Sequence, residues 1–226
     1  MNEINYDYIV EYVRAIRPSS QGILREIEIK VASGEETWPI IKPEVASFME
    51  VILSIKKPTR ILEIGTAVGY SAILMSQYLQ PGGKITTIER FHVMQEHARN
   101  NIKKAGLEDT INMIEGEAGK VLPTLEDGRF DLIFMDSAKG QYISFLPQCV
   151  RLLKDDGILI TDNVLHKGEV GKSRYLIPRR QRTTHVKLRE FLFEIYQHPQ
   201  LKSAVLPFGD GVAISHKFGG NLNEKQ

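Results

Sequence analysis

The sequence predicts an α/β fold built on a mostly parallel sheet, with a helical N-terminal part and an antiparallel edge near the C-terminus. From residue 60 onward, short apolar runs rich in Ile, Leu and Phe alternate with segments of helical periodicity. This alternation is typical of right-handed βαβ units whose strands are covered on both faces. Two later apolar runs flank a short turn at residues 207–211, which indicates an antiparallel hairpin.

The individual elements follow from these patterns in chain order. Apolar residues at helical spacing predict three N-terminal helices, and Pro43 suits the first position of the third. Strands are expected at residues 61–64, 84–88, 111–114, 130–135, 157–161, 204–206 and 212–215. Helices are expected between them at residues 71–78, 93–105, 118–122, 142–153 and 186–196. We predict a single domain over residues 1–226: a helical part (1–57), a core (58–217) and a polar, frayed tail (218–226).

Composition excludes several classes of protein. The chain has 226 residues and a formal net charge of +1, long enough to bury a core without disulfides or a structural metal. Cys149 is the single cysteine, which excludes a disulfide framework and a cysteine-based zinc site. The first residues lack a signal-peptide pattern, and no stretch approaches the ~18–20 apolar residues of a membrane span. We therefore expect a soluble, cytoplasmic protein without membrane contact.

Basic residues are concentrated between residues 167 and 189. Eight Lys or Arg stand there against Glu169 alone, a net charge of +7, which leaves −6 for the rest of the chain. Such a block suggests an anionic partner, although a solvated helix face is the simpler interpretation of a basic run alone. Because arginine contacts phosphates and stacks on bases, four residues are candidate RNA contacts. These are Arg174, Arg179, Arg180 and Arg182.

A glycine-containing turn follows the first predicted strand, in the pattern E-x-G-x-x-x-G-Y-S. Gly65 permits a tight turn and close approach of a ligand, and Glu89 ends the next strand, where it can accept hydrogen bonds from ribose hydroxyls. Ala67 and Tyr70 stand where a dinucleotide fingerprint has glycine, which disfavours NAD. Glu63, Gly65 and Glu89 together indicate a cofactor pocket for adenosine. An ordinary βα turn and a helix-start glutamate are the open alternatives.

Oxygen-bearing side chains end two later strands. Asp136 follows the strand at residues 130–135, and Asp162 and Asn163 follow the strand at residues 157–161. Carboxylate and amide oxygens, without imidazole or thiolate, suit Mg²⁺ or Ca²⁺. We therefore predict a divalent cation held by Asp136, Asp162 and Asn163, against the alternative that a single aspartate only caps a helix.

Four segments carry a family resemblance: residues 63–71 (EIGTAVGYS), 100–107 (NNIKKAGL), 130–142 (FDLIFMDSAKGQY) and 162–170 (DNVLHKGEV). They resemble the cation-dependent O-methyltransferases, the family of catechol and caffeoyl-CoA O-methyltransferases, over roughly residues 40–215. The resemblance implies a Rossmann-like, seven-stranded methyltransferase fold with an antiparallel last strand, and a homodimer. It also implies S-adenosylmethionine as methyl donor and Mg²⁺, or another divalent cation, as cofactor.

Carried over by position, the resemblance assigns roles to individual residues. The expected contacts of S-adenosylmethionine are Ile41, Gly65, Ser71, Glu89, Ala118 and Asp136. Lys139 matches the lysine proposed as general base in the family, and neutralisation of Asp136 is its alternative role. A cation that binds a hydroxyl and its neighbouring oxygen lowers the hydroxyl pKa and fixes the oxyanion for methyl transfer.

Within that family, the element RRQRT and the closing PFGDGVAIS most resemble the bacterial tRNA 5-hydroxyuridine methyltransferases. The resemblance implies methylation of wobble 5-hydroxyuridine in the tRNA anticodon loop, whose hydroxyl stands beside a carbonyl oxygen as in a catechol. Arg14, Arg17 and Arg25 either extend the RNA surface or are solvated helix faces. Two other functions stay open: a small-molecule catechol or hydroxycinnamoyl-type O-methyltransferase, and a non-catalytic RNA-binding protein with the same fold.

Overall fold

The computed structural model describes residues 4–219, and most of the tail predicted to fray, residues 220–226, lies outside this range. Its seven strands follow the order β3-β2-β1-β4-β5-β7-β6 in one sheet. The pairs β1–β2, β2–β3 and β4–β5 are parallel, whereas β7 pairs antiparallel with β5 and β6. The predicted mostly parallel, seven-stranded sheet with an antiparallel last strand is therefore confirmed.

The described chain divides into two compact units. One contains Val10–Val121, and the other contains the residues before Val10 and those from Leu122 onward. The expected single domain over residues 1–226 stays a prediction.

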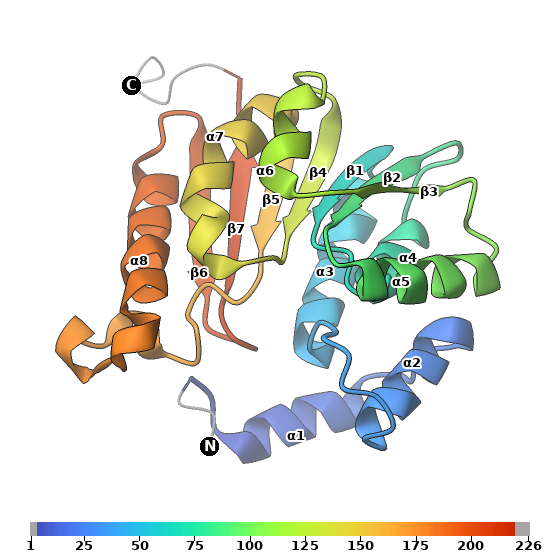
Figure 1. Ribbon diagram of the computed structural model, residues 1–226, viewed down its shortest axis with the longest axis horizontal. Helices are drawn as coiled ribbons and strands as arrows, with labels where there is room; N and C mark the ends of the chain where they lie inside the picture. Colours follow the sequence, from blue (N-terminus) through green and yellow to red (C-terminus); the bar gives the residue numbers. More distant parts are fainter. Residues whose placement is uncertain (1–3, 220–226) are drawn as a thin grey trace. The chain divides into compact units, whose positions relative to one another are not determined.

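The unit of residues 10–121 holds the first three strands, β1 (Arg60–Ile64), β2 (Lys84–Glu89) and β3 (Ile111–Glu115). Helices α4 (Tyr70–Ser76) and α5 (His92–Lys104) pack on β2, as Figure 1 shows. Two N-terminal helices, α2 (Gly22–Ala32) and α3 (Pro43–Lys56), pack in turn on α4. The short helix α6 (Ala118–Val121) ends the unit. Pro43 stands at the start of α3, as its fixed φ predicts.

The second unit holds β4 (Phe130–Met135), β5 (Leu153–Thr161), β6 (Leu201–Leu206) and β7 (Val212–Lys217). Its two long helices are α7 (Tyr142–Leu152) and α8 (Arg182–Gln197). Figure 1 shows α8 beside β6, and the two helices also contact each other. Their buried aromatic residues Tyr142 and Phe191 meet edge to face, with ring centroids 5.7 Å apart.

The basic segment, residues 173–182, departs from regular helix. It forms two single 3-10 turns, Arg174–Leu176 and Arg179–Gln181, before α8 begins. The preceding loop contains three successive residues with positive φ: His166, Lys167 and Gly168. A right-handed helix cannot pass through such a run, and Pro178 also lacks the amide hydrogen that a helix needs. The segment is therefore held in turns rather than as the solvated helix face considered above.

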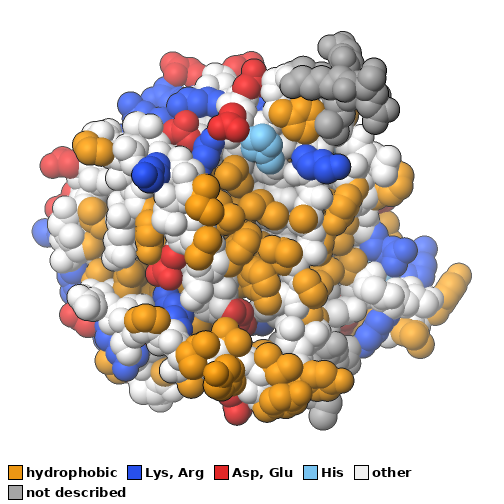
Figure 2. All heavy atoms as spheres, turned by 180° about the vertical axis from the view of Figure 1, so that it is seen from behind, with side chains coloured by type: hydrophobic (Ala, Val, Ile, Leu, Met, Phe, Trp, Pro, Cys, Tyr) orange, Lys and Arg blue, Asp and Glu red, His pale blue; other side chains and the backbone are white. Residues whose placement is uncertain are grey.

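Helix α1 (Asp7–Ile16) buries none of its residues. Its large apolar side chains are exposed instead: Tyr8, Ile9, Tyr12, Val13 and Ile16. Hydrophobic side chains gather along the lower edge of Figure 2, the edge at which α1 runs in Figure 1. The predicted homodimer stays a prediction.

Among the described residues, no helix is both long enough and apolar enough to cross a membrane.

Candidate active site

The turn that follows β1, residues 65–71, is held to β2 through its main chain. The amides of Gly65 and Thr66 donate to the carbonyl of Ile88 at 3.0 and 3.2 Å. Ala67 and Gly69 both adopt positive φ, of 46° and 83°. This conformation explains why residue 69 is a glycine, since the left-handed region is unfavourable for residues with a side chain. The tight turn predicted from the glycine pattern is present.

Glu63, at the end of β1, lies beneath the turn and is 0% exposed. Its carboxylate accepts hydrogen bonds from the hydroxyls of Ser71 and Thr87, the latter at 2.5 Å. Because the Thr87 hydrogen is used in this way, the Thr66 hydroxyl, 2.6 Å away, donates to Thr87. Glu63 thus fixes the orientation of Ser71. Direct contact of either residue with a cofactor stays a prediction.

Glu89, at the end of β2, joins its strand to the turn. One carboxylate oxygen accepts the amide of Ala67 at 2.9 Å, and the other accepts the amides of Arg90 and Phe91 at 2.8 and 2.9 Å. A carboxylate offers about four acceptor positions, so these three bonds leave about one for a ribose hydroxyl. The sequence predicted that Glu89 binds ribose. It did not predict that Glu89 also holds the turn by hydrogen bonds.

Two polar residues of α5 complete this support. The Asn101 side-chain amide donates to the carbonyl of Val68 at 2.9 Å, and that of Gln95 donates to the carbonyl of Glu89 at 2.8 Å. Both side chains are buried. The sequence analysis did not predict these two residues. A polar residue at a helix position that should face the core would have indicated them.

Of the remaining predicted cofactor residues of this unit, Ala118 lies near the same strand ends. Strand register places Ile64 beside Ile88 and Glu89 beside Glu115, so β1, β2 and β3 end at one edge. Ala118 follows β3 at the start of α6 and is partly exposed, whereas Ile41 is buried just before α3. In open α/β sheets ligands bind at the carboxyl ends of strands, which fits these positions.

Asp136 follows β4 in the second unit, and Lys139 begins a 3-10 turn three residues later. Burial raises the pKa of the Asp136 carboxyl, and the charge of Lys139 opposes this rise. The electrostatic interaction means that the lysine is close enough to act on this carboxylate. Both predicted roles of Lys139, base and counter-charge, fit this placement. The predicted contact of Asp136 with the cofactor is untested.

Asp162 and Asn163 follow β5 in the same unit. The amide of Asp162 donates to the carbonyl of Met135 at 3.1 Å, so the ends of β4 and β5 are directly bonded. Asp162 is 2% exposed, and one oxygen of its carboxylate accepts a hydrogen bond from the main-chain amide of Asn163 at 2.6 Å. Asn163 has a φ of 61°, a conformation that asparagine tolerates better than most residues.

Tyr142, the first residue of α7, is a further site residue that sequence reasoning missed. Its fully buried hydroxyl shares its one hydrogen between the carbonyls of Asp162, at 3.1 Å, and Ser137, at 3.3 Å. Burial raises the pKa of this phenol, and the nearby charges of Asp136 and Asp162 raise it further. Tyr142 therefore stays protonated and ties the segment after β4 to the segment after β5.

The chemistry of this region fits a hard divalent cation. Two buried or partly buried carboxylates and an amide supply oxygen donors, which Mg²⁺ and Ca²⁺ prefer. The hydroxyls of Ser137 and Thr161, each next to one aspartate, are buried without a hydrogen-bond partner in residues 4–219. Within that range no three His, Cys, Asp or Glu side chains are grouped to hold a metal, and the third predicted ligand, Asn163, is an amide. Cation binding stays a prediction.

The four candidate arginines differ in their surroundings. Arg174, Arg179 and Arg180 are exposed, and in the described part of the chain none has a side-chain partner. Arg182 is partly buried, and its Nε donates to the carbonyl of Ile177 at 3.0 Å, so it helps to hold the segment in shape. Tyr175, between these arginines in sequence, is 81% exposed. An exposed aromatic residue among arginines suits contact with bases as well as phosphates.

The basic segment and the Lys139 turn meet the same helix. The 3-10 turns of the segment pack on α8, and so does the turn of Lys139. A Cβ atom at Gly140 would lie 3.9 Å from side-chain atoms of both Thr184 and Lys187 on α8. Helix α8 therefore connects the basic segment to the turn that carries Lys139.

The N-terminal arginines are engaged elsewhere. Arg14 forms a two-pronged ion pair with Glu44, at 2.9 and 3.0 Å. Arg17 pairs with Glu50 at 3.3 Å and approaches Glu28 at 3.8 Å. Arg25 approaches the same Glu28 at 3.7 Å. These pairs are internal, so the expected extension of an RNA surface by Arg14 and Arg17 is not supported by their contacts.

Comparison with known proteins agrees with this arrangement. Caffeoyl-CoA O-methyltransferase of Eucalyptus gunnii is 30% identical over 227 residues, which cover 94% of this chain and 87% of the relative. Catechol O-methyltransferase of Mycobacterium tuberculosis is 31% identical over 130 residues, 58% of this chain and 59% of the relative. The SAH-bound crystal structure of the Podospora anserina methyltransferase PaMTH1 has a TM-score of 0.83 at 27% identity and 97% coverage of both chains. The sequence model of the O-methyltransferase family matches residues 19–218. The chain belongs to the O-methyltransferase family.

Proposed function

We propose that this protein transfers a methyl group from S-adenosylmethionine to a hydroxyl that has a second oxygen beside it. The donor binds at the turn of residues 65–71, where Glu89 keeps an acceptor position for ribose and Ser71 is fixed by Glu63. The SAH-bound Podospora anserina relative supports this choice of donor.

The acceptor binds at the residues that follow β4 and β5. Asp136, Asp162 and Asn163 would hold a divalent cation there, which would supply Lewis acidity and lower the pKa of the acceptor hydroxyl. Lys139, in its neutral form, takes the hydroxyl proton and passes it to solvent. The new bond joins the acceptor oxygen to the methyl carbon as the sulfur–methyl bond breaks. The products are a methyl ether and S-adenosylhomocysteine.

We propose wobble 5-hydroxyuridine of tRNA as the acceptor, forming 5-methoxyuridine. The observation that carries this choice is the exposed surface of Arg174, Tyr175, Arg179 and Arg180. Arginines without internal partners suit phosphates, and the exposed tyrosine suits an unstacked base of the anticodon loop.

A small phenol is the second candidate acceptor. The matched relatives include a catechol and a caffeoyl-CoA O-methyltransferase, whose acceptors, as named, are not RNA. A catechol offers the same pair of neighbouring oxygens as 5-hydroxyuridine. In this case the basic segment has no part in acceptor binding, or contacts an acidic small molecule.

The experiment compares acceptors with purified protein and labelled S-adenosylmethionine. We expect methyl transfer to tRNA that carries 5-hydroxyuridine, none to the same tRNA with unmodified uridine, and loss of transfer with chelator. Transfer to catechol but not to tRNA would select the second candidate. Binding of tRNA without transfer to any acceptor would indicate a non-catalytic RNA-binding protein. Transfer that survives chelator would remove the cation from the proposal.

A further inference from the structure

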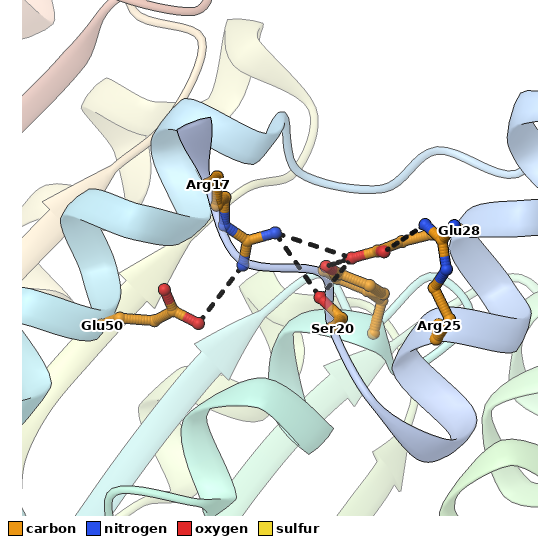
Figure 3. Close-up of polar contacts among 6 residues, drawn as sticks. Arg17, Ser20, Arg25, Glu28 and Glu50 are labelled. Atoms are coloured by element: carbon orange, nitrogen blue, oxygen red, sulfur yellow. Dashed lines mark hydrogen bonds and ion pairs between the residues drawn. The ribbon is translucent and has the colours of Figure 1, made fainter. Parts of the chain in front are cut away.

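A cluster of charged and polar side chains joins the N-terminal helices to α4. Figure 3 shows Arg17, Ser20, Arg25, Glu28 and Glu50 converging, with the Glu28 carboxylate at the centre. These residues come from the link that follows α1, from α2 and from α3. Ser20, Glu28 and Glu50 had no predicted role.

Glu28 receives hydrogen bonds from two hydroxyls on the same oxygen. Ser20 donates to Oε1 at 2.6 Å, and Tyr70 donates to Oε1 at 2.6 Å. Arg17, whose side chain is mostly buried, supplies the balancing charge at 3.8 Å and also donates to Ser20 at 3.5 Å. Hydrogen bonds to an ionised carboxylate are about twice as strong as neutral ones.

Tyr70 brings this cluster to the cofactor turn. It is the first residue of α4, directly after Gly69 and directly before Ser71, and it is 3% exposed. Burial, followed by its bond to Glu28, raises the pKa of the Tyr70 phenol, so the hydroxyl remains a donor at physiological pH. Glu28 on α2 therefore reaches the turn through one short hydrogen bond.

The other supports of the turn come from strands β1 and β2 and from helix α5. Glu89 fixes the amide of Ala67, Asn101 fixes the carbonyl of Val68, and Glu63 fixes the side chain of Ser71. Within residues 4–219, the hydrogen bond from Tyr70 to Glu28 connects helix α2 to this turn. Its loss would free the junction between the turn and α4, where Ser71 is placed.

We propose that Glu28 and Tyr70 are positioning residues for the methyl donor, and that α2 holds the cofactor turn through them. The proposal rests on the proposed binding of S-adenosylmethionine at residues 65–71. Neither residue is expected to touch the donor. They act through the main chain that carries Ser71, with Arg17 holding the Glu28 carboxylate in place.

The test measures binding of S-adenosylhomocysteine by calorimetry to folded wild-type protein, four single variants and the double variant Tyr70→Phe/Glu28→Ala. Tyr70→Phe removes only the hydroxyl, and Glu28→Ala removes its acceptor. Glu28→Gln keeps an acceptor oxygen for Tyr70 and serves as the conservative rescue. Arg25→Ala is the matched control, because Arg25 lies 3.7 Å from the same carboxylate but is exposed and does not contact the turn.

We expect Tyr70→Phe and Glu28→Ala to raise the dissociation constant about 5- to 20-fold, part of the full effect of a hydrogen bond to a charged group. The double variant should be no worse than Glu28→Ala, because both changes remove the same bond. Glu28→Gln should recover most of the affinity, and Arg25→Ala should match wild type. Among the kinetic constants, the KM for S-adenosylmethionine should rise while kcat at saturating donor stays near wild type.

A lower urea midpoint with an unchanged dissociation constant in Tyr70→Phe would overturn the proposal, because the cluster would then serve stability alone. Should Glu28→Ala fail to fold, Tyr70→Phe and Glu28→Gln decide the question, together with hydrogen exchange of the amides of residues 66–71. Faster exchange in Tyr70→Phe is the expected result, and unchanged exchange contradicts it. Failure of wild type itself to bind S-adenosylhomocysteine would refute the proposed donor site, and this proposal with it.

Discussion

The cofactor turn and the basic segment satisfy their polar groups in opposite ways. In residues 65–71, hydrogen bonds tie both main chain and side chains to Glu63, Glu89, Asn101 and Glu28. In residues 173–182, three arginines point their charges outward with no partner in residues 4–219. The polar groups of the turn are hydrogen-bonded within the protein itself, whereas the charges of the basic segment are available to water or to a ligand.

This difference has a physical consequence for mutation. A residue inside a closed hydrogen-bond network contributes to stability and to ligand geometry together, because its loss leaves buried partners unsatisfied. An exposed charge contributes little to stability, since water replaces its partner. Changes at the turn should therefore alter folding and donor binding, whereas changes around Lys139 and the basic segment should alter function alone.

The largest expected effect is at Lys139. Lys139→Ala should lower kcat by about 10²- to 10⁴-fold, the usual contribution of a general base. The dissociation constant of S-adenosylhomocysteine should stay within about twofold of wild type, since this lysine belongs to the acceptor region. Steady-state kinetics and calorimetry measure the two quantities. Lys202→Ala, at an exposed position of β6, is the control, and unchanged turnover in Lys139→Ala would retire the base assignment.

Glu63 tests the closed network of the turn. Glu63→Ala should lower the free energy of unfolding by about 2–4 kcal/mol, because the buried hydroxyls of Ser71 and Thr87 lose a charged acceptor. Binding of S-adenosylhomocysteine should weaken in the same variant. Urea unfolding and calorimetry are the measurements. As a control, Glu117→Ala removes an exposed carboxylate of the same unit and should change neither the stability nor the affinity. Lower stability with intact binding in Glu63→Ala would show that Glu63 serves folding and not donor binding.

The basic segment should show the reverse behaviour. Replacing Arg174, Arg179 and Arg180 by Ala together should weaken tRNA binding roughly 10- to 100-fold at low salt. The slope of log affinity against log salt should fall by about 2, for three lost phosphate contacts. The urea midpoint should not move. Lys103→Ala/Lys104→Ala, two exposed lysines of α5, control for net charge, and an unaltered salt slope in the arginine variant would exclude the segment as a tRNA surface.

The smallest effect concerns Cys149, buried in α7. Burial raises the pKa of its thiol to about 12, so at pH 8 only about one molecule in 10⁴ carries the thiolate. Because the folded value lies above the unfolded value of about 8.5, the resulting stability is complete below pH 8.5 and is lost as pH rises toward 12. Ellman's reagent at pH 8 should react only after unfolding in guanidinium. Rapid reaction of the native protein would show that α7 opens readily.

Much of the fold was predictable because its signals are local. Alternating apolar runs located the strands, and the pattern from Glu63 to Ser71 located the turn, since a βα turn depends on a few adjacent residues. Boundaries were less certain where polar residues enter a strand. Strand β5 starts at Leu153, four residues before the expected start, and its residue Lys154 forms an ion pair with Asp131 at 2.7 Å.

The sequence by itself determined the family, the order of the strands along the chain and the residues that end them. Only the tertiary structure decided which polar side chains serve the fold and which face solvent. It showed that Glu89 bonds to the turn, that Tyr142 bonds to the segments after two strands, and that Tyr70 bonds to Glu28. It also showed that Arg14 is paired, whereas Arg174 is exposed. The physical reason is that burial and pairing depend on residues distant in the chain. Arg14 and Arg174 are the same residue type with the same charge, and they differ only in whether a carboxylate such as Glu44 lies within reach.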